Sequence, residues 1–172
     1  MSGAASVVVV DINGVLGDVS NKKAAGRPKA DAMLPSGQYF YLNPNSQMFL
    51  RTLERTVPLV LWTSRLRKNA GPIEHLPAIK DTRFIAMMHG EDCVKTRVGG
   101  YHPVKRVGTL RERLPPDLRN ASIIFVDDSP KYVETDGNSS VLYCESYTAA
   151  EDNSWNLEEI VCNIQSIYGI RL

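Results

Sequence analysis

Short, unbroken apolar runs dominate the pattern of hydrophobic and polar positions along the chain. The clearest are SVVVV at residues 6–10, LVLW at 59–62 and IIFV at 123–126. Runs of this kind, without polar alternation, are typical of strands buried on both faces, as in a parallel sheet covered by helices. Further short strands are predicted from the apolar runs at residues 39–42, 84–88 and 141–143.

Apolar residues at helical spacing lie between these runs. An Asn-Pro-Asn-Ser turn at residues 43–46 precedes such a pattern and predicts a helix over residues 46–56. Weaker helical patterns cover residues 65–76 and 104–114, the second of them basic, and an amphipathic pattern covers 155–168. Apolar strands that alternate with helices predict an α/β fold: a Rossmann-like, doubly wound parallel sheet with helices on both faces.

The length of the chain and one irregular stretch set the expected domain organisation. With 172 residues, the chain has the size of one ordinary domain, so we expect a single domain over residues 1–172. Residues 17–38 are rich in Lys, Ala, Gly, Pro and Ser and show little periodicity, which predicts an exposed loop or flap. A domain of this size leaves no room for a large cap domain over the sheet.

Composition narrows the classes of function. The formal net charge of +1 gives no overall electrostatic field that would indicate a nucleic-acid or membrane partner. The three cysteines are far apart and form no CxxC pair, so neither a disulfide framework nor a zinc site is expected. The first apolar run is too short for a signal peptide or a membrane span, and we expect an intracellular protein of the cytoplasm or nucleus.

Polar side chains follow three of the predicted strands. Asp11 ends the first run, Thr63 and Ser64 end the second, and Asp127 and Asp128 end the third. Any one of these residues could simply begin a turn or cap a helix. Together, however, they meet at the carboxyl edge of a parallel sheet, where the carboxylates would repel one another without a cation. Oxygen ligands of this kind predict a Mg²⁺ cofactor.

The order of these segments resembles that of the haloacid dehalogenase superfamily of phosphoryl-transfer enzymes. Its first motif is similar to VVVVDINGVL, its second to LVLWTS and its fourth to IIFVDDSP. The tetrad DDSP and the segments YFYLNP and GEDCVKTRVGGYHPVK resemble the branch of RNA polymerase II carboxy-terminal-domain phosphatases, the NLI-interacting-factor-like group. The resemblance covers residues 7–143 and implies an HAD-like fold, with only the small flap and no large cap domain.

The resemblance also implies roles for individual residues. Asp11 would be the nucleophile that accepts the phosphoryl group as an aspartyl-phosphate. Thr63, or alternatively Ser64, would hydrogen-bond the phosphoryl oxygens. Ser64 and Arg65 are therefore expected to bind substrate.

The third motif of the superfamily is a lysine, for which the chain offers Lys105 and, as a second choice, Lys95. Lys105 is preferred because it follows the Gly-Gly-Tyr segment in the family order, although a lysine at the start of a basic helix is often just solvated. The implied magnesium ligands are Asp11, the main-chain carbonyl of Asn13, Asp127 and Asp128.

One position departs from the family pattern. Active members carry a second Asp where this chain has Asn13, and that Asp protonates the leaving oxygen and then activates water. An amide can donate a hydrogen bond but cannot exchange a proton, so we expect slow turnover. Two hypotheses follow. The first is a magnesium-dependent phosphomonoesterase, a slow Ser/Thr phosphatase that acts on a phosphorylated protein segment. The second is a catalytically impaired, phosphatase-like adaptor that binds a protein partner.

Overall fold

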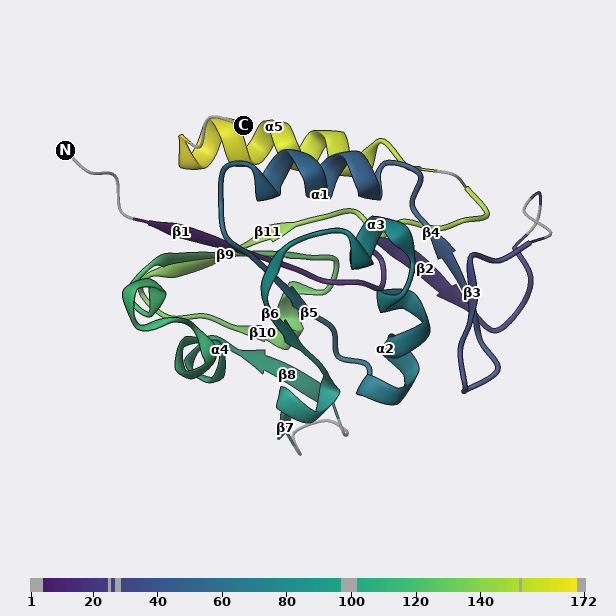
Figure 1. Cartoon of the computed structure of the whole chain (residues 1–172), viewed down its shortest axis with the longest axis horizontal. Coiled ribbons are helices and arrows are strands. Elements are labelled where there is room, and N and C mark those ends of the chain that lie inside the picture. The colour runs from purple at the N-terminus through teal and green to yellow at the C-terminus, as the bar shows by residue number, and fades with distance from the viewer. Residues whose placement is uncertain (1–4, 25, 27–28, 97–101, 152, 170–172) are drawn as a thin grey trace.

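A five-stranded parallel sheet forms the centre of the computed structural model, which describes residues 5–24, 26, 29–96, 102–151 and 153–169. The strands lie in the order β11-β9-β1-β5-β6, and each neighbouring pair is parallel (Figure 1). Their bounds are β1 Ser6–Val10, β5 Leu59–Trp62, β6 Phe84–Met88, β9 Ser122–Asp127 and β11 Ser139–Tyr143. The α/β fold with a central parallel sheet agrees with the prediction from the sequence.

Both faces of the sheet are covered. Figure 1 shows α1 (Ser46–Glu54) and α5 (Asn156–Tyr168) side by side over one face, with α4 (Val107–Arg113) across the other. The two remaining α-helices, α2 (Arg67–Glu74) and α3 (Pro77–Lys80), add apolar residues to the α1 and α5 side. The described ranges also contain the short 3₁₀ helices Gly90–Asp92, Pro116–Leu118 and Pro130–Tyr132. None of the helices in the described ranges is long and apolar enough to cross a membrane.

Strand β1 explains why its sequence lacks polar alternation. Val8 and Val10 pack into the core cluster under α1 and α5, whereas Val7 and Val9 pack into the cluster under α4. Successive side chains of a strand point to opposite faces, so a strand covered on both sides must be apolar at every position. The unbroken apolar run therefore places β1 at the centre of the sheet.

The order of the strands places a crevice beside β1. The chain runs from β1 to β5 and β6 on one side, and then returns to β9 and β11 on the other. In open parallel sheets, ligands bind at the carboxyl ends of the strands where this reversal occurs. The ends of β1 and β9 therefore mark the expected position of a site.

The predicted flap is more ordered than expected. Strands β2 (Gly17–Ser20) and β3 (Ala32–Met33) occupy its two ends and pair antiparallel with β4 (Tyr39–Leu42), in the order β2-β4-β3. We call these three strands the flap sheet. The prediction of a loop over residues 17–38 was thus wrong at both ends, because Val19 pairs with Phe40, whose ring is fully buried. Residues 25, 27 and 28 lie outside the described part of the chain.

A second correction concerns residues 104–114. The predicted helix begins only at Val107, because His102–Arg106 forms strand β8. This strand pairs antiparallel with β7 (Val94–Thr96) and parallel with β10 (Val133–Glu134). We call this group the lysine sheet because it carries Lys105. Pro103 disfavours a helix at the residue before it and agrees with the extended backbone found there.

Candidate active site

Three site residues lie at the carboxyl edge of the central sheet. Asp11 directly follows β1, Thr63 follows β5, and Asp127 is the last residue of β9. The sheet ladder continues through the first two, because Asp11 N–H donates to the Val126 carbonyl at 3.1 Å and Thr63 N–H donates to the Met88 carbonyl at 3.1 Å. The parallel pairing of β1 with β9 therefore brings the two carboxylates to the same end of the crevice.

Lys105 lies between these carboxylates. Its Nζ is 2.9 Å from Asp11 Oδ1 and 2.6 Å from Asp127 Oδ2. All three residues are buried, with exposed fractions of 7% for Asp11, 3% for Asp127 and 4% for Lys105. Lys95, the second choice from the sequence, lies exposed on β7 instead. The lysine sheet thus places one buried cation at the carboxyl edge of the central sheet.

The acidic residues outnumber this cation. Oxygens of Asp11, Asp127 and Asp128 lie within 4.8 Å of one another. Asp11 Oδ1 is buried, and its partner among the described residues is the Lys105 ammonium at 2.9 Å. Three carboxylates that share one ammonium carry excess negative charge and fit a small divalent cation with hard oxygen ligands, so the residues present suit Mg²⁺.

Burial and charge shift the pKa values in this cluster. Burial raises the pKa of Asp11 from its ordinary value of 3.8 to about 6, against the opposing charge of Lys105. Burial also raises the pKa of Asp128, although a hydrogen bond with Ser146 opposes this. For Lys105, burial lowers the pKa, but the charges of Asp11 and Asp127 outweigh it and the net shift is upward. The site thus favours positive charge.

The turn after β1 depends on Gly14. Its φ of 81° lies in the left-handed region, and its N–H donates to the Gly17 carbonyl at 2.7 Å. A Cβ at this position would lie 2.0 Å from Asp128 Oδ2 and 2.8 Å from Ser146 Oγ. Glycine therefore permits both the turn and the close approach of Asp128.

Asn13 lies in the same turn and lines the cleft. Its Oδ1 accepts a hydrogen bond from the Val19 N–H at 3.1 Å, which fixes the orientation of the amide. Its Nδ2 makes no hydrogen bond to any residue in the described ranges. The side chain can therefore present a hydrogen-bond donor to a ligand, but not an exchangeable acidic proton.

The residues after β5 divide into a buried and an exposed group. Thr63 is buried, and its hydroxyl accepts the Arg65 N–H at 3.2 Å. Ser64 is exposed and lines the cleft. Gly90 fixes the loop after β5, because its N–H donates to the Arg65 carbonyl at 2.7 Å. Of the two hydroxyls considered from the sequence, it is therefore Ser64 that faces the cleft.

The cleft at this edge has a volume of about 180 Å³. It is lined by Asp11, Asn13, Ser64, Pro103, Lys105, Asp127, Asp128, Ser129 and Tyr132. Sequence reasoning did not identify Pro103, Ser129 or Tyr132. Ser129 follows the acidic pair, and its N–H donates to Asp127 Oδ1 at 2.8 Å. The tetrad DDSP could therefore have indicated that Ser129 lies at the site. Tyr132 packs against His102 with ring centroids 5.1 Å apart. No local sequence pattern predicts this contact.

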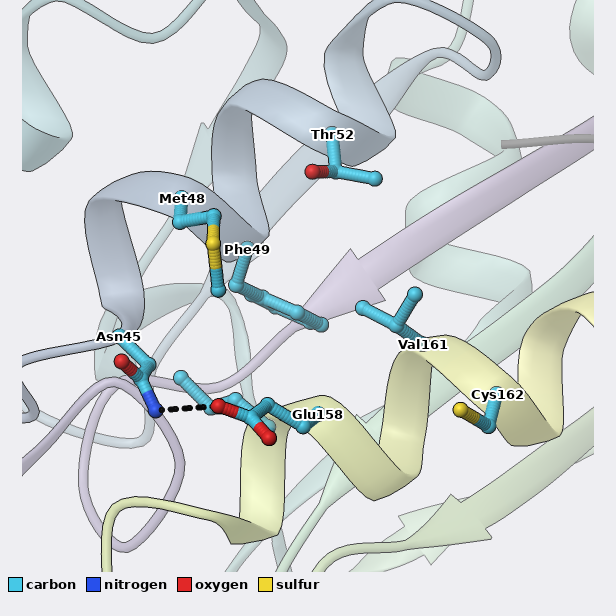
Figure 2. A pocket seen from close by; sticks show the side chains of 8 residues that line it. Asn45, Met48, Phe49, Thr52, Glu158, Val161 and Cys162 are labelled. Atoms are coloured by element: carbon cyan, nitrogen blue, oxygen red, sulfur yellow. Dashed lines mark hydrogen bonds between the residues drawn. The ribbon is translucent and has the colours of Figure 1, made fainter.

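A second cavity, of about 270 Å³, lies between α1 and α5. Figure 2 shows Met48, Phe49 and Thr52 of α1 facing Val161 and Cys162 of α5. At one end, Asn45 Nδ2 donates to Glu158 Oε1 at 3.2 Å. We call this cavity the helix groove. Its apolar lining makes it unsuited to phosphoryl transfer.

Comparisons with known proteins identify the family of the chain. The sequence model of the NLI interacting factor-like phosphatase family matches residues 6–169. No individually curated protein matches the chain. The structure of Fcp1, an essential RNA polymerase II CTD phosphatase, is similar over 92% of this chain and 50% of that chain, with a TM-score of 0.57 and 12% identity.

A second structure, of a fission yeast Fcp1 variant bound to beryllium fluoride, is similar over 95% of this chain and 52% of that one, with a TM-score of 0.50 and 11% identity. The chain thus spans about half the length of both solved structures, and the likeness at this identity concerns the fold. The match of the family model covers nearly the whole chain. The chain therefore belongs to the NLI interacting factor-like phosphatases, which have an HAD-like fold.

Proposed function

We propose that this protein is a magnesium-dependent phosphomonoester hydrolase, a slow Ser/Thr protein phosphatase that works through an aspartyl-phosphate on Asp11. The observation that supports this most is the position of Lys105 Nζ, which is 2.9 Å from Asp11 Oδ1 and 2.6 Å from Asp127 Oδ2. A cation at this point can hold the nucleophile in its ionised form and neutralise phosphoryl oxygens.

In the proposed reaction, a carboxylate oxygen of Asp11 attacks phosphorus while the bond to the substrate oxygen breaks. The leaving alkoxide takes a proton from solvent, and water then hydrolyses the acyl-phosphate to release inorganic phosphate and restore Asp11. Ser64 and Asn13 Nδ2 line the cleft and would donate hydrogen bonds to oxygens of the substrate. Mg²⁺ held by Asp11, Asp127, Asp128 and the Asn13 carbonyl would supply positive charge for the transferring group.

Asn13 sets the expected rate. Positioned general acid-base groups contribute roughly a hundred- to ten-thousand-fold, so their absence slows both proton-dependent steps without removing phosphate binding. Thr63 supports the same site indirectly, because its hydroxyl accepts the N–H of Arg65 and so orders the Ser64 loop.

The substrate class rests on two arguments. The described residues place two small sheets beside the cleft, and such an open site suits a segment of another protein better than a metabolite that must be enclosed. The two solved structures described above are of an RNA polymerase II CTD phosphatase, an enzyme that acts on a domain of a protein. We extend that substrate class, a phosphorylated protein segment, to this chain, and with it a location inside the cell.

A second candidate function is that of a non-catalytic adaptor that binds a protein partner. The observation that favours it is Asn13, since the position of the general acid carries an amide. Turnover separates the two functions. We expect purified protein to hydrolyse para-nitrophenyl phosphate in the presence of Mg²⁺ and to lose this activity when EDTA removes the metal. A rate equal to that of buffer in Mg²⁺ would leave the adaptor as the better interpretation.

The metal site has its own test. Calorimetric titration with Mg²⁺ should show binding to the wild type and at least about tenfold weaker binding to Asp127→Ala, because the variant loses a carboxylate ligand. Asp117→Ala removes an exposed carboxylate from a 3₁₀ helix and is the matched control. Equal affinity in all three proteins would contradict the proposed site. A crystal soaked with Mg²⁺ and beryllium fluoride should show beryllium fluoride bound to a carboxylate oxygen of Asp11.

A further inference from the structure

Arg65 differs from three arginines of β8 and α4 in its partners. Arg106, Arg111 and Arg113 each form an ion pair with a carboxylate. Arg65 is half-buried, but no carboxylate in the described part of the chain forms an ion pair with it. Among the described residues, its side-chain partner is a neutral amide: Nη1 donates to Gln38 Oε1 at 3.0 Å. Its Nε is buried and has no partner among the described residues.

The side chain of Gln38 is held from both ends. Its Oε1 accepts a second hydrogen bond from Ser36 Oγ at 3.1 Å, and its Nε2 donates to Asn21 Oδ1 at 2.9 Å. Asn21 follows β2 and Gln38 precedes β4, so these bonds belong to the flap sheet. The flap sheet thus holds the Arg65 guanidinium in a fixed place at low cost in side-chain entropy.

The backbone of Arg65 is fixed as well. Its N–H donates to Thr63 Oγ1 at 3.2 Å, and its carbonyl accepts the Gly90 N–H at 2.7 Å. The guanidinium is close enough for the charge of Asp11 to act on it, yet Ser64 lines the cleft and Arg65 does not. The cation therefore lies beside the place of the reacting phosphoryl group rather than inside it.

An arginine that is half-buried, fixed by two elements and without a carboxylate partner in the described part of the chain has donors left for a carboxylate or a phosphate. We propose that Arg65, positioned by Gln38, determines specificity by binding a second anionic group of the substrate next to the phosphoryl group. This group is the carboxylate of an acidic residue or the phosphate of a second phosphorylated residue. The inference rests on the proposed function, because it assumes a phosphorylated protein segment in the cleft.

Binding of labelled peptides to the Asp11→Asn protein tests the inference without turnover. Three peptides share one phosphoserine, flanked by alanine, by glutamate or by a second phosphoserine. We expect the two acidic peptides to bind at least about fivefold more tightly than the alanine peptide, as measured by fluorescence anisotropy. Comparison of the glutamate and phosphoserine peptides then distinguishes the two sources of the second anion.

Variants assign this preference to one residue. Arg65→Met should reduce the acidic-to-neutral affinity ratio to about one, Arg65→Lys should restore part of it, and Gln38→Leu should lower it. Arg67→Met removes an exposed arginine two positions away and should keep the full ratio. An unchanged ratio in Arg65→Met, an equal loss in Arg67→Met, or no preference in the parent protein would overturn the inference.

The outcome is distinct from that of the proposed function. If the wild type hydrolyses para-nitrophenyl phosphate with Mg²⁺ but the peptide preference is absent, the inference fails alone. If the preference depends on Arg65 but no metal-dependent turnover occurs, the phosphatase proposal fails and an anion-reading adaptor remains. Thermal unfolding of each variant identifies a loss of fold. If Arg65→Met does not fold, the peptide preference of Arg65→Lys, which keeps the charge, tests the inference instead.

Discussion

The cleft at the carboxyl edge of the sheet and the helix groove are built from different parts of one fold. The groove is the larger, at about 270 Å³ against about 180 Å³. It is lined by facing residues of two helices, and its charged residue, Glu158, accepts a hydrogen bond from Asn45 at one end. The cleft instead gathers Asp11, Lys105 and Asp127 from three different strands.

The difference shows what makes a cavity chemically useful. The side chains that line the helix groove come from the apolar faces of two helices. They offer apolar contact area but no converging charged groups. Residues at the ends of parallel strands are held by the sheet, and the buried charges of Asp11 and Asp127 are partly compensated there by Lys105. In this molecule, convergence of strand ends rather than cavity volume identifies the candidate site.

The largest expected difference between the two cavities lies in turnover. Asp11→Asn should lower hydrolysis of para-nitrophenyl phosphate by at least about a thousandfold, because the amide cannot form the acyl-phosphate. Cys162→Ser, in the helix groove, should keep the rate within about twofold of the wild type. The buried Cys93→Ser and Cys144→Ser should do the same. Loss of turnover in a cysteine variant, with Asp11→Asn active, would reverse the comparison.

Stability should separate the cavities next. Lys105→Met leaves Asp11 and Asp127 buried without their cation, and should lower the free energy of unfolding by about 3–5 kcal/mol in EDTA. Urea titration measures this loss, and Mg²⁺ should recover part of it because the metal supplies positive charge. Glu158→Gln removes an exposed charge at the groove and should cost less than about 1 kcal/mol. Equal losses in the two variants would show that Lys105 is not a structural counter-ion.

A smaller effect is expected where the cleft departs from its family. Asn13→Asp should raise turnover by at least about tenfold, because it restores a group that can exchange a proton. One carboxylate oxygen can accept the Val19 N–H as Asn13 Oδ1 does, which leaves the second oxygen in the place of Nδ2. Steady-state kinetics with Mg²⁺ checks the rate. An unchanged rate in a variant that binds Mg²⁺ would mean that more than this one group limits the cleft.

The smallest change is expected from the groove itself. Met48 is 56% exposed, so Met48→Ser should alter turnover by less than about twofold and the free energy of unfolding by less than about 1 kcal/mol. The same assay and urea titration measure both quantities. A tenfold drop in turnover would show that the helix groove affects the cleft and would contradict the separation of the two cavities.

The sequence was most informative where one structural rule dominated. Residues buried on both faces of a parallel sheet must be apolar, so β1, β5 and β9 and the polar residues at their ends could be read directly. The flanking sheets were harder, because β3 and β10 have two residues each and leave no periodicity to detect. Strand β8 has five residues, but its basic sequence HPVKR runs directly into α4 and was taken as part of that helix.

Site residues follow the same division. Asp11 and Asp127 could be placed together because strand pairing alone brings them close. Gln38 and Tyr132 approach the site through the packing of the two small sheets, which no local pattern encodes. Lys105 could be ranked above Lys95 only through the family order, since both sit in basic stretches. The roles of these residues remain predictions for the experiments above.

The pairing of β1 with β9 also has a kinetic consequence. Val10 pairs with Leu61 on one side and with Val126 on the other. The pairing with Val126 therefore encloses a much longer stretch of chain than the pairing with Leu61. Long loops slow folding, because their closure entropy is lost before the contacts form. During synthesis, β1 can pair with β5 long before β9 emerges from the ribosome. We therefore expect the carboxylates of the cleft to meet late in folding, and a nascent chain that lacks β9 to keep one side of β1 open to wrong partners.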